Sequence, residues 1–457
     1  MSVRTQLAMT AACRAAPWLV AFLCVYGPLA ASADEPTSGP QRLPPVATPA
    51  SLDSPSEFVT HEELEKALDK AAWRKGDLKI TPYGALWGDV IYATQRTNPG
   101  AYTLFVPSTE EQGEDAFTID ARRTRLGLEL AGPGLATLDG SSTAAKLEID
   151  FHGNFVTENR AGVLLRLAYW ELKNDDWRLL MGQAEDVISP LNPGTLNYSV
   201  GWNGGNIGFR RAQVRAERHV AFGADSKFLV QTSLNHDIVS DFQTDAGVRR
   251  ESADWPVVQG RTGVLLGRAR PDLAPIQLGV SGHIGQSGFD FLTAGPPPLN
   301  LPPLDDARYE TWSFNVDLRL PLGPSWGVQG EFFHGANLSS YLGGIGQGVC
   351  PCARVPIRST GGWGELWLDW TPTWHSHVGY GLDDPRNGDS LIGRVSNQFV
   401  FANLSTDLTK HWTTGVEVSW WKTLYHDERV GLIPPALLTP RAPGESITID
   451  WMVKFGF

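Results

Sequence analysis

Residues 446–457 read SITIDWMVKFGF, and this stretch decides the fold. Counted back from Phe457, every second side chain is large and apolar, whereas the alternate positions include Lys454 and Asp450. Because successive side chains of a strand point to opposite faces, this period of two predicts a β-strand with one apolar face. A half-buried strand of a soluble protein alternates in the same way, so the other strands must distinguish a membrane barrel from a soluble β-sandwich.

The composition of the 457 residues favours strands over membrane helices. The chain contains 48 Gly, 17 Trp and 4 Met, and 19% of its residues are charged. A mean hydropathy of -0.18 excludes a bundle of membrane helices, and no run after the N-terminal segment approaches the roughly 18 apolar residues that a spanning helix needs. The net charge of -12 argues against nucleic acid as a partner, because binding phosphates requires concentrated Lys and Arg.

Residues 1–33 have the pattern of a secretory signal peptide. Arg4 and Arg14 precede an apolar run, and small residues at positions 31–33 form a cleavage motif. The run is short, and acidic residues follow it, which favours cleavage over a membrane anchor. We therefore expect export across the inner membrane, with the Pro- and Ser-rich residues 34–57 as a flexible linker.

A short periplasmic helix is predicted over residues 58–76. Thr60 and Glu63 form a capping box, and Gly76 stands where a glycine commonly ends a helix. Apolar residues one turn apart form a narrow stripe on this segment. Such a stripe suits either a short coiled coil that joins protomers or a helix that lies against the mouth of a barrel.

From residue 78 to residue 457 the pattern has a period of two, and about sixteen runs approach the length that crosses the apolar band of a membrane. In Thr311–Leu320 the apolar side chains face one way, and Asp317 and Arg319 face the other. Charged residues recur on the second face of many such runs. Lipid outside and water inside explain a charged face, whereas a soluble sandwich needs a matching apolar interior.

The connections between these runs alternate between short and long. The short ones are 173–176, 271–273, 322–325 and 371–373, and the long ones are 95–116, 185–205, 286–309, 336–360 and 425–445. Membrane barrels have short periplasmic turns and long external loops, whereas long loops are uncommon in a compact soluble domain. The sequence therefore predicts an all-β protein, a transmembrane antiparallel β-barrel of about sixteen strands over residues 78–457.

No catalytic or cofactor-binding signature is present in the sequence. There is no G-x-S-x-G, phosphate-binding glycine loop or HExxH motif. His375 and His377 share one strand face, but no third ligand lies near them in sequence, so we predict neither a metal site nor a catalytic residue. Cys350 and Cys352, two residues apart, would form only a very small loop if an oxidising compartment joined them as a disulfide.

Residues 182–218 carry the most specific family resemblance. They read GQAEDVISPLNPGTLNYSVGWNGGNIGFRRAQVRAER, a strand ending in Gly-Gln, a long third loop with Pro and Gly, and an Arg-rich return strand. This arrangement resembles trimeric outer-membrane porins, most closely the DcaP-like and phosphate-selective groups. The last strand also resembles the closing strand of Gram-negative barrels, in which Phe457, Phe455 and Trp451 would form the assembly signal for the membrane.

The resemblance implies that the third loop folds into the lumen and narrows it. Negative charge at this constriction would come from Glu185 and Asp186. Positive charge on the wall would come from Arg123, Arg125, Arg166, Arg211 and Arg215. Opposed charges discriminate solutes by charge, although each Arg has the alternative of an ion pair with a neighbouring strand. The many inward acids depart from the dense cationic ladder of phosphate-selective relatives, which speaks against phosphate specificity.

The expected function is a passive diffusion channel of the outer membrane for small hydrophilic solutes, with anions among the candidates. The expected partners are outer-membrane lipid and two further copies of the chain in a homotrimer, without cofactor or nucleic acid. Two alternatives stay open. One is a barrel-borne hydrolase with a polar cluster at the rim near His375 and His377, and the other is a secreted carbohydrate-binding β protein that uses its many Trp residues.

Overall fold

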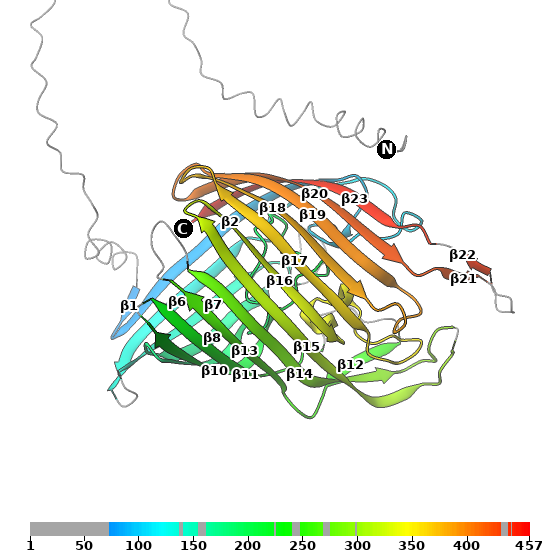
Figure 1. Cartoon of the computed structure of the whole chain (residues 1–457), viewed down its shortest axis with the longest axis horizontal. Helices are drawn as coiled ribbons and strands as arrows, with labels where there is room; N and C mark the ends of the chain where they lie inside the picture. The colour runs from blue at the N-terminus through cyan, green and yellow to red at the C-terminus, as the bar shows by residue number, and fades with distance from the viewer. Residues whose placement is uncertain are drawn as a thin grey trace, which may run out of the picture. The chain divides into compact units, whose positions relative to one another are not determined.

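A computed structural model describes residues 73–136, 140–153, 161–223, 225–239, 247–267, 275–297, 299–430, 437–439 and 441–457. The predicted signal peptide (1–33), the predicted linker (34–57) and most of the predicted helix (58–76) lie outside these residues. The described residues form an antiparallel β-barrel, as the sequence predicts (Figure 1).

In the described part of the chain the barrel has 16 strands. Two of them are interrupted: β5 and β6 both pair with β2, and β12 and β13 both pair with β14. The barrel closes where β23 pairs with β2 from Ala85↔Gly456 to Ala93↔Thr448. The strands are β2 (Leu78–Ala93), β5 (Ala116–Asp120), β6 (Arg125–Leu135), β7 (Ser141–Asp150), β8 (Leu164–Lys173), β9 (Trp177–Glu185), β10 (Arg210–Phe222), β11 (Ser226–Asn235), β12 (Val248–Ser252), β13 (Val257–Leu266), β14 (Ile276–Phe291), β15 (Leu304–Gly323), β16 (Trp326–Ala336), β17 (Arg358–Asp369), β18 (Trp374–Pro385), β19 (Arg394–Asp407), β20 (Trp412–Tyr425) and β23 (Gly444–Gly456).

The apolar faces of the strands point outward and the polar faces point into the barrel. On β15, the Phe314 side chain is 48% exposed, whereas Asp317 is 1% exposed. On β23, Asp450 is buried, and Trp451 on the opposite face is partly exposed, which confirms the predicted phase. Water would disfavour this broad apolar exterior by roughly 25 cal/mol for each Å² left exposed, so the surface suits a lipid environment.

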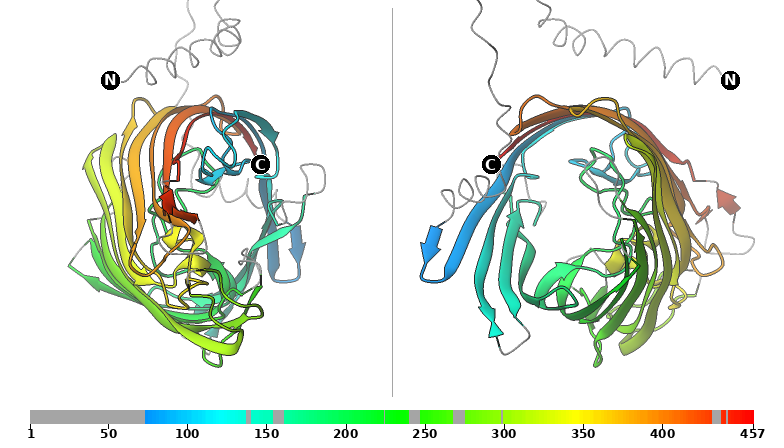
Figure 2. Two further views of the ribbon diagram at one scale, coloured as in Figure 1. Left: turned by 90° about the vertical axis from the view of Figure 1, so that its right-hand side faces the viewer. Right: turned by 60° about the vertical axis from the view of Figure 1, so that its left-hand side comes forward.

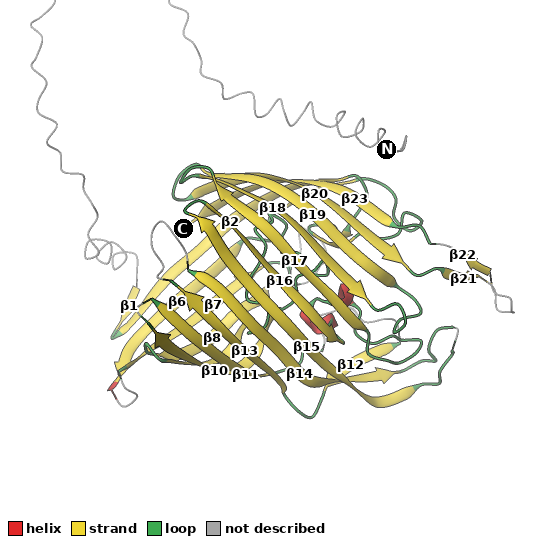
Figure 3. Ribbon diagram, viewed as in Figure 1, coloured by secondary structure: helices red, strands yellow, loops and turns green. Residues whose placement is uncertain are grey.

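Short and long connections alternate around the barrel. The short ones include 174–176, 324–325, 370–373 and 408–411. The long ones include loop 1 (94–115), loop 3 (186–209), loop 5 (292–303) and loop 6 (337–357), and loop 6 contains the short helical turns η3 (Ser339–Tyr341) and η4 (Gly344–Gly346) (Figure 3). Loop 5 is shorter than the predicted 286–309, because β14 and β15 stay paired as far as Phe291↔Leu304.

The described end of the predicted helix is a strand instead. β1 (Trp73–Lys75) pairs with the first residues of β2, from Trp73↔Ile80 to Lys75↔Leu78. Gly76 has a φ of +61° at the turn between them. The left-handed conformation that glycine tolerates suits a hairpin turn as well as a helix end. For this reason Gly76 does not distinguish the end of a helix from the turn observed here. No helix in the described ranges is long and apolar enough to cross a membrane.

A candidate constriction inside the barrel

Loop 3 lies inside the barrel, where Figure 2 shows loops within the ring of strands. Its sequence favours this placement, because Pro190 and Pro193 prevent regular secondary structure and leave isolated N–H groups in the residues that follow them. These groups bind the wall that faces β9 and β10 across the lumen. The donors and acceptors are the Leu191 N–H and Glu331 at 2.7 Å, the Gly194 N–H and Glu365 at 2.6 Å, and the Leu196 N–H and Glu417 at 2.7 Å.

The acceptors stand on β16, β17 and β20, so three separate strands hold the loop. Glu417 also accepts a hydrogen bond from the Thr195 hydroxyl at 2.7 Å, and Asn403 on β19 donates to the Gly194 carbonyl at 2.8 Å. The three bonds to Leu191, Gly194 and Leu196 are at the short end of the range for N–H···O hydrogen bonds. The far wall therefore fixes the path of loop 3 across the lumen.

A buried ion pair closes the base of loop 3. Asp186 accepts hydrogen bonds from the Phe209 N–H at 2.9 Å, from Arg211 Nη2 at 3.0 Å and from Gln259 Nε2 at 2.8 Å. The Arg211 guanidinium is centred 3.8 Å from the middle of the Tyr341 ring, and Arg211 is 2% exposed.

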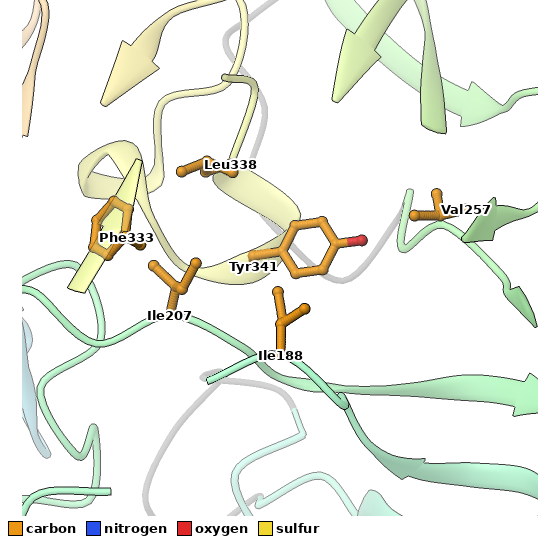
Figure 4. Packing of buried hydrophobic residues seen from close by; sticks show 6 residues of the cluster. All are labelled: Ile188, Ile207, Val257, Phe333, Leu338 and Tyr341. Carbon is orange, nitrogen blue, oxygen red and sulfur yellow. The ribbon is translucent and has the colours of Figure 1, made fainter. Parts of the chain in front are cut away.

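Apolar residues surround Tyr341 next to this pair. Figure 4 shows the cluster, which consists of Ile188, Ile207, Val257, Phe333, Leu338 and Tyr341. Loop 3 contributes Ile188 and Ile207, and loop 6 contributes Leu338 and Tyr341. The cluster shields Asp186 and Arg211 from the channel space, so this pair acts mainly on the position of loops 3 and 6.

Arg166 is held by two carboxylates on β7. Its Nε lies 2.6 Å from Glu148 and its Nη1 lies 2.9 Å from Asp150. The Tyr198 hydroxyl of loop 3 donates to the same Asp150 carboxylate at 2.7 Å. Burial, together with the negative charge of Asp150, raises the pKa of Tyr198 to about 12, so the phenol stays protonated as a donor. Arg166 thus anchors the near wall against loop 3.

Arg123 and Arg125 lie beside the Trp87 ring. Their guanidinium carbons are 4.7 and 5.7 Å from the ring centre, and Lys454 Nζ is 5.5 Å from it. Arg123 also donates to the Leu196 carbonyl of loop 3 and lies 3.8 Å from Asp89. Within the described residues no carboxylate is within salt-bridge distance of Arg125 or Lys454. We call Arg123, Arg125 and Lys454 around Trp87 the cationic patch.

Glu185 and Arg215 lie on opposite faces of the barrel wall. Glu185 shares the strand face of the outward residues Leu179 and Met181, and its side chain is 58% exposed. Arg215 points inward, with its Nε 3.1 Å from Glu217, and it donates to the Glu185 carbonyl at 3.2 Å. The structure thus groups Asp186 with Arg211, and Arg123 with Arg125, but it does not bring all seven predicted residues into one ring.

The two histidines on β18 are paired with acids. His375 Nδ1 lies 2.6 Å from Asp369 and its Nε2 lies 3.7 Å from Asp407, while His377 Nδ1 lies 3.2 Å from Glu365. In the described part of the chain, neither histidine belongs to a possible metal site. Among the described residues, one group of three ligating side chains is close enough to hold a metal, and it consists of Glu251, Asp290 and Asp306. Arg249 and Arg308 already pair with members of that group.

Sequence comparisons find no matching family model and no matching curated protein. Solved structures do match. The outer membrane channel DcaP of Acinetobacter baumannii has 16% identity and a TM-score of 0.63, over 85% of this chain and 100% of that chain. The in-vitro folded outer membrane protein OmpT of Vibrio cholerae has 10% identity and a TM-score of 0.51, over 84% and 99%. At these identities the likeness shows a shared fold, that of a β-barrel.

Proposed function

We propose that this chain is an outer-membrane porin, a passive channel through which small hydrophilic solutes diffuse. The observation that supports it most is loop 3, which is bonded to the far wall of a polar lumen inside a barrel with an apolar exterior. A loop fixed in this way narrows the path and limits solutes by size and charge without chemistry.

The cationic patch supports a preference for anions among these solutes. Arg125 and Lys454 carry positive charge beside Trp87, and the described residues place no carboxylate within salt-bridge distance of either. In contrast, Arg166, Arg211 and Arg215 are committed to acids or carbonyls. We therefore assign charge selection to the patch, and we assign the other arginines to holding the wall and the loop.

We also propose that residues 1–33 are removed on export and that three copies of the chain assemble in the outer membrane. Phe457, Phe455 and Trp451 would serve as the assembly signal. Their position at the seam between β23 and β2 supports this role, because the seam joins the first and last barrel strands. Crosslinking of the protein in outer-membrane vesicles should give dimers and trimers, and a monomer at every crosslinker dose would contradict the trimer.

Conductance in planar bilayers tests the porin proposal. Purified, folded protein should insert as stepwise increases in current in simple salt, because an open polar lumen passes hydrated ions. A change in the mobility of the protein on heating would establish independently that the barrel is folded. Folded protein that inserts into the bilayer and carries no current would refute the channel.

A barrel-borne hydrolase is the second candidate, favoured by the close contact between His375 and Asp369. Both ring nitrogens of His375 face carboxylates, which leaves neither directed at a serine or cysteine nucleophile. Hydrolysis of activated esters by the folded barrel, lost in His375→Gln, would support this candidate over the channel. Equal background rates in both proteins would dismiss it.

A further inference from the structure

Loop 6 contains a pair of cysteines that the channel does not use. Cys350 and Cys352 flank Pro351, and both are fully buried. They pack with Ile357 and Ala353 in a small apolar cluster. Their Sγ atoms are 2.7 Å apart. Non-bonded heavy atoms prefer separations of roughly 3.5 to 4.0 Å, whereas bonded sulfurs lie about 2.05 Å apart, so two separate thiols fit this site poorly.

The backbone of loop 6 brings the two side chains together. The Cys350 N–H donates to the Val355 carbonyl at 2.9 Å, and the Arg354 N–H donates to the Cys350 carbonyl at 2.7 Å. Arg354 has a φ of +53°, a left-handed conformation that is uncommon for a residue other than glycine. A turn of this kind needs support from contacts around it, because a left-handed residue other than glycine costs about 1 to 3 kcal/mol.

This turn connects loop 6 to loop 5. The Arg354 side chain donates to the Leu301 and Pro302 carbonyls and lies 4.5 Å from the centre of the Phe291 ring. Loop 6 also carries Tyr341, which covers Arg211 at the base of loop 3. A constraint at Cys350 and Cys352 would therefore stabilise loops at the mouth of the barrel as well as its own turn.

The alternative of a bound metal ion lacks ligands. Zinc in structural sites takes four Cys, His or carboxylate ligands, and among the described residues no group of three ligating side chains includes either cysteine. The Cys352 thiol is also unreactive once the loop has folded. Burial, followed by the contact with Cys350, raises the pKa of the Cys352 thiol to about 11, so little thiolate is present at neutral pH.

We propose that Cys350 and Cys352 are joined by a disulfide that closes the turn of loop 6. The two cysteine thiols lose two protons and two electrons as the S–S bond forms. The disulfide bond of an external thiol oxidant accepts them and is reduced to two thiols. The bond forms before loop 6 packs, because both cysteines are fully buried in the folded loop, where a thiol oxidant cannot reach them. The proposal rests on the proposed outer-membrane location, since such a chain folds in an oxidising compartment.

Peptide mass spectrometry tests the bond directly. The full chain is extracted from membranes without reductant, denatured with a thiol-blocking maleimide and digested with trypsin. Both cysteines fall in the peptide Leu320–Arg354, because no Lys or Arg lies between Arg319 and Arg354. We expect this peptide without maleimide and lighter than its reduced form by the mass of two hydrogen atoms. After reduction of the denatured chain it should carry two maleimides.

Three outcomes would overturn the proposal. Two maleimides without reductant would mean free thiols. Two maleimides that appear only after treatment with a chelator would mean a metal site. A link from either cysteine to another peptide would mean a different disulfide. These readouts require no channel activity, so a barrel without conductance would refute the porin and leave the disulfide result to be judged on its own.

Proteolysis of the folded barrel provides the second arm. Trypsin should cut after Arg354 about tenfold faster in Cys350→Ser/Cys352→Ser than in the oxidised protein, because the turn opens more often without the bond. Heat-dependent gel mobility confirms that the variant is folded, and cleavage at Arg74 or Lys75, far from loop 6, is the matched control. Equal rates at Arg354 in both proteins would contradict a constraining role for the bond.

Discussion

Arg211 and Arg125 both lie on inward-facing strand positions next to loop 3, yet they have opposite surroundings. Arg211 is buried, bonded to Asp186 and stacked on Tyr341. Arg125 is partly exposed beside Trp87, and no carboxylate of the described residues lies within salt-bridge distance of it. The difference shows that residue type and strand phase alone do not identify the charges that meet a solute. A cation selects solutes only where its charge is not already compensated.

The largest effect is expected for Asp186→Ala. It leaves the Arg211 guanidinium buried without its counter-charge, which costs about 3 to 5 kcal/mol. We expect a lower midpoint in heat-dependent gel mobility, and larger, noisier conductance steps because loop 3 loses its base. Asp186→Ala combined with Arg211→Met restores neutrality and should recover part of the stability. An Asp186→Ala barrel with wild-type steps would contradict the role of this pair.

Glu417→Ala removes the acceptor that holds the other part of loop 3, and it should have the second largest effect. The Leu196 N–H and the Thr195 hydroxyl lose their acceptor, at roughly 0.5 to 1.5 kcal/mol for each hydrogen bond. Single-channel recordings should show larger steps with added noise, while the barrel stays folded. Glu129→Ala is the matched control, since that carboxylate pairs with Lys146 and makes no bond to loop 3.

Arg125→Ala removes a cation that has no carboxylate within salt-bridge distance among the described residues. We expect the ratio of anion to cation permeability to fall by about twofold, with a stability change of no more than about 1 kcal/mol from the lost cation–π contact. The reversal potential in a salt gradient measures the ratio. Arg218→Ala, which removes a cation paired with Asp176 near a short turn, should leave it unchanged. An unchanged reversal potential in Arg125→Ala would remove the cationic patch from the selectivity mechanism.

The smallest effect on conductance is expected for Tyr198→Phe. The variant loses one hydrogen bond to Asp150, worth about 1.5 to 3 kcal/mol for a charged acceptor, but the ring still packs in its aromatic cluster. Because the pKa of Tyr198 is about 12, the wild-type phenol remains a donor throughout the neutral range. The shift in unfolding temperature should therefore be the same at about pH 6 and about pH 9, and a shift at only one of them would contradict this assignment.

The barrel and its phase follow from the sequence because a period of two is a local property. The alternation of Trp451 and Asp450 needs no knowledge of other strands, and the structure keeps both faces as predicted. The ends of β14 and β15 were harder to predict, because the paired hairpin that they form carries polar residues that resemble a loop.

The function of individual charges could not be read in the same way. Glu331 and Glu417 are recognisable as inward acids, but their bonds to Leu191 and Leu196 join positions 140 and 221 residues apart. The burial of Arg211 depends on Tyr341, which a different loop supplies. Such contacts are determined by the path of loops inside the lumen, and strand periodicity contains no information about that path.

The seam of the barrel has a consequence for the kinetics of folding. Gly84 and Phe457 exchange two backbone hydrogen bonds of 3.1 and 3.0 Å, and a Cβ on Gly84 would lie 2.7 Å from Cζ of the Phe457 ring. This contact joins residues near opposite ends of the described chain, and such distant pairings form slowly. A methyl group at position 84 would also lie 2.6 Å from the backbone oxygen of Arg125 on β6, so it would slow the formation of the seam and of the β2–β6 pairing together.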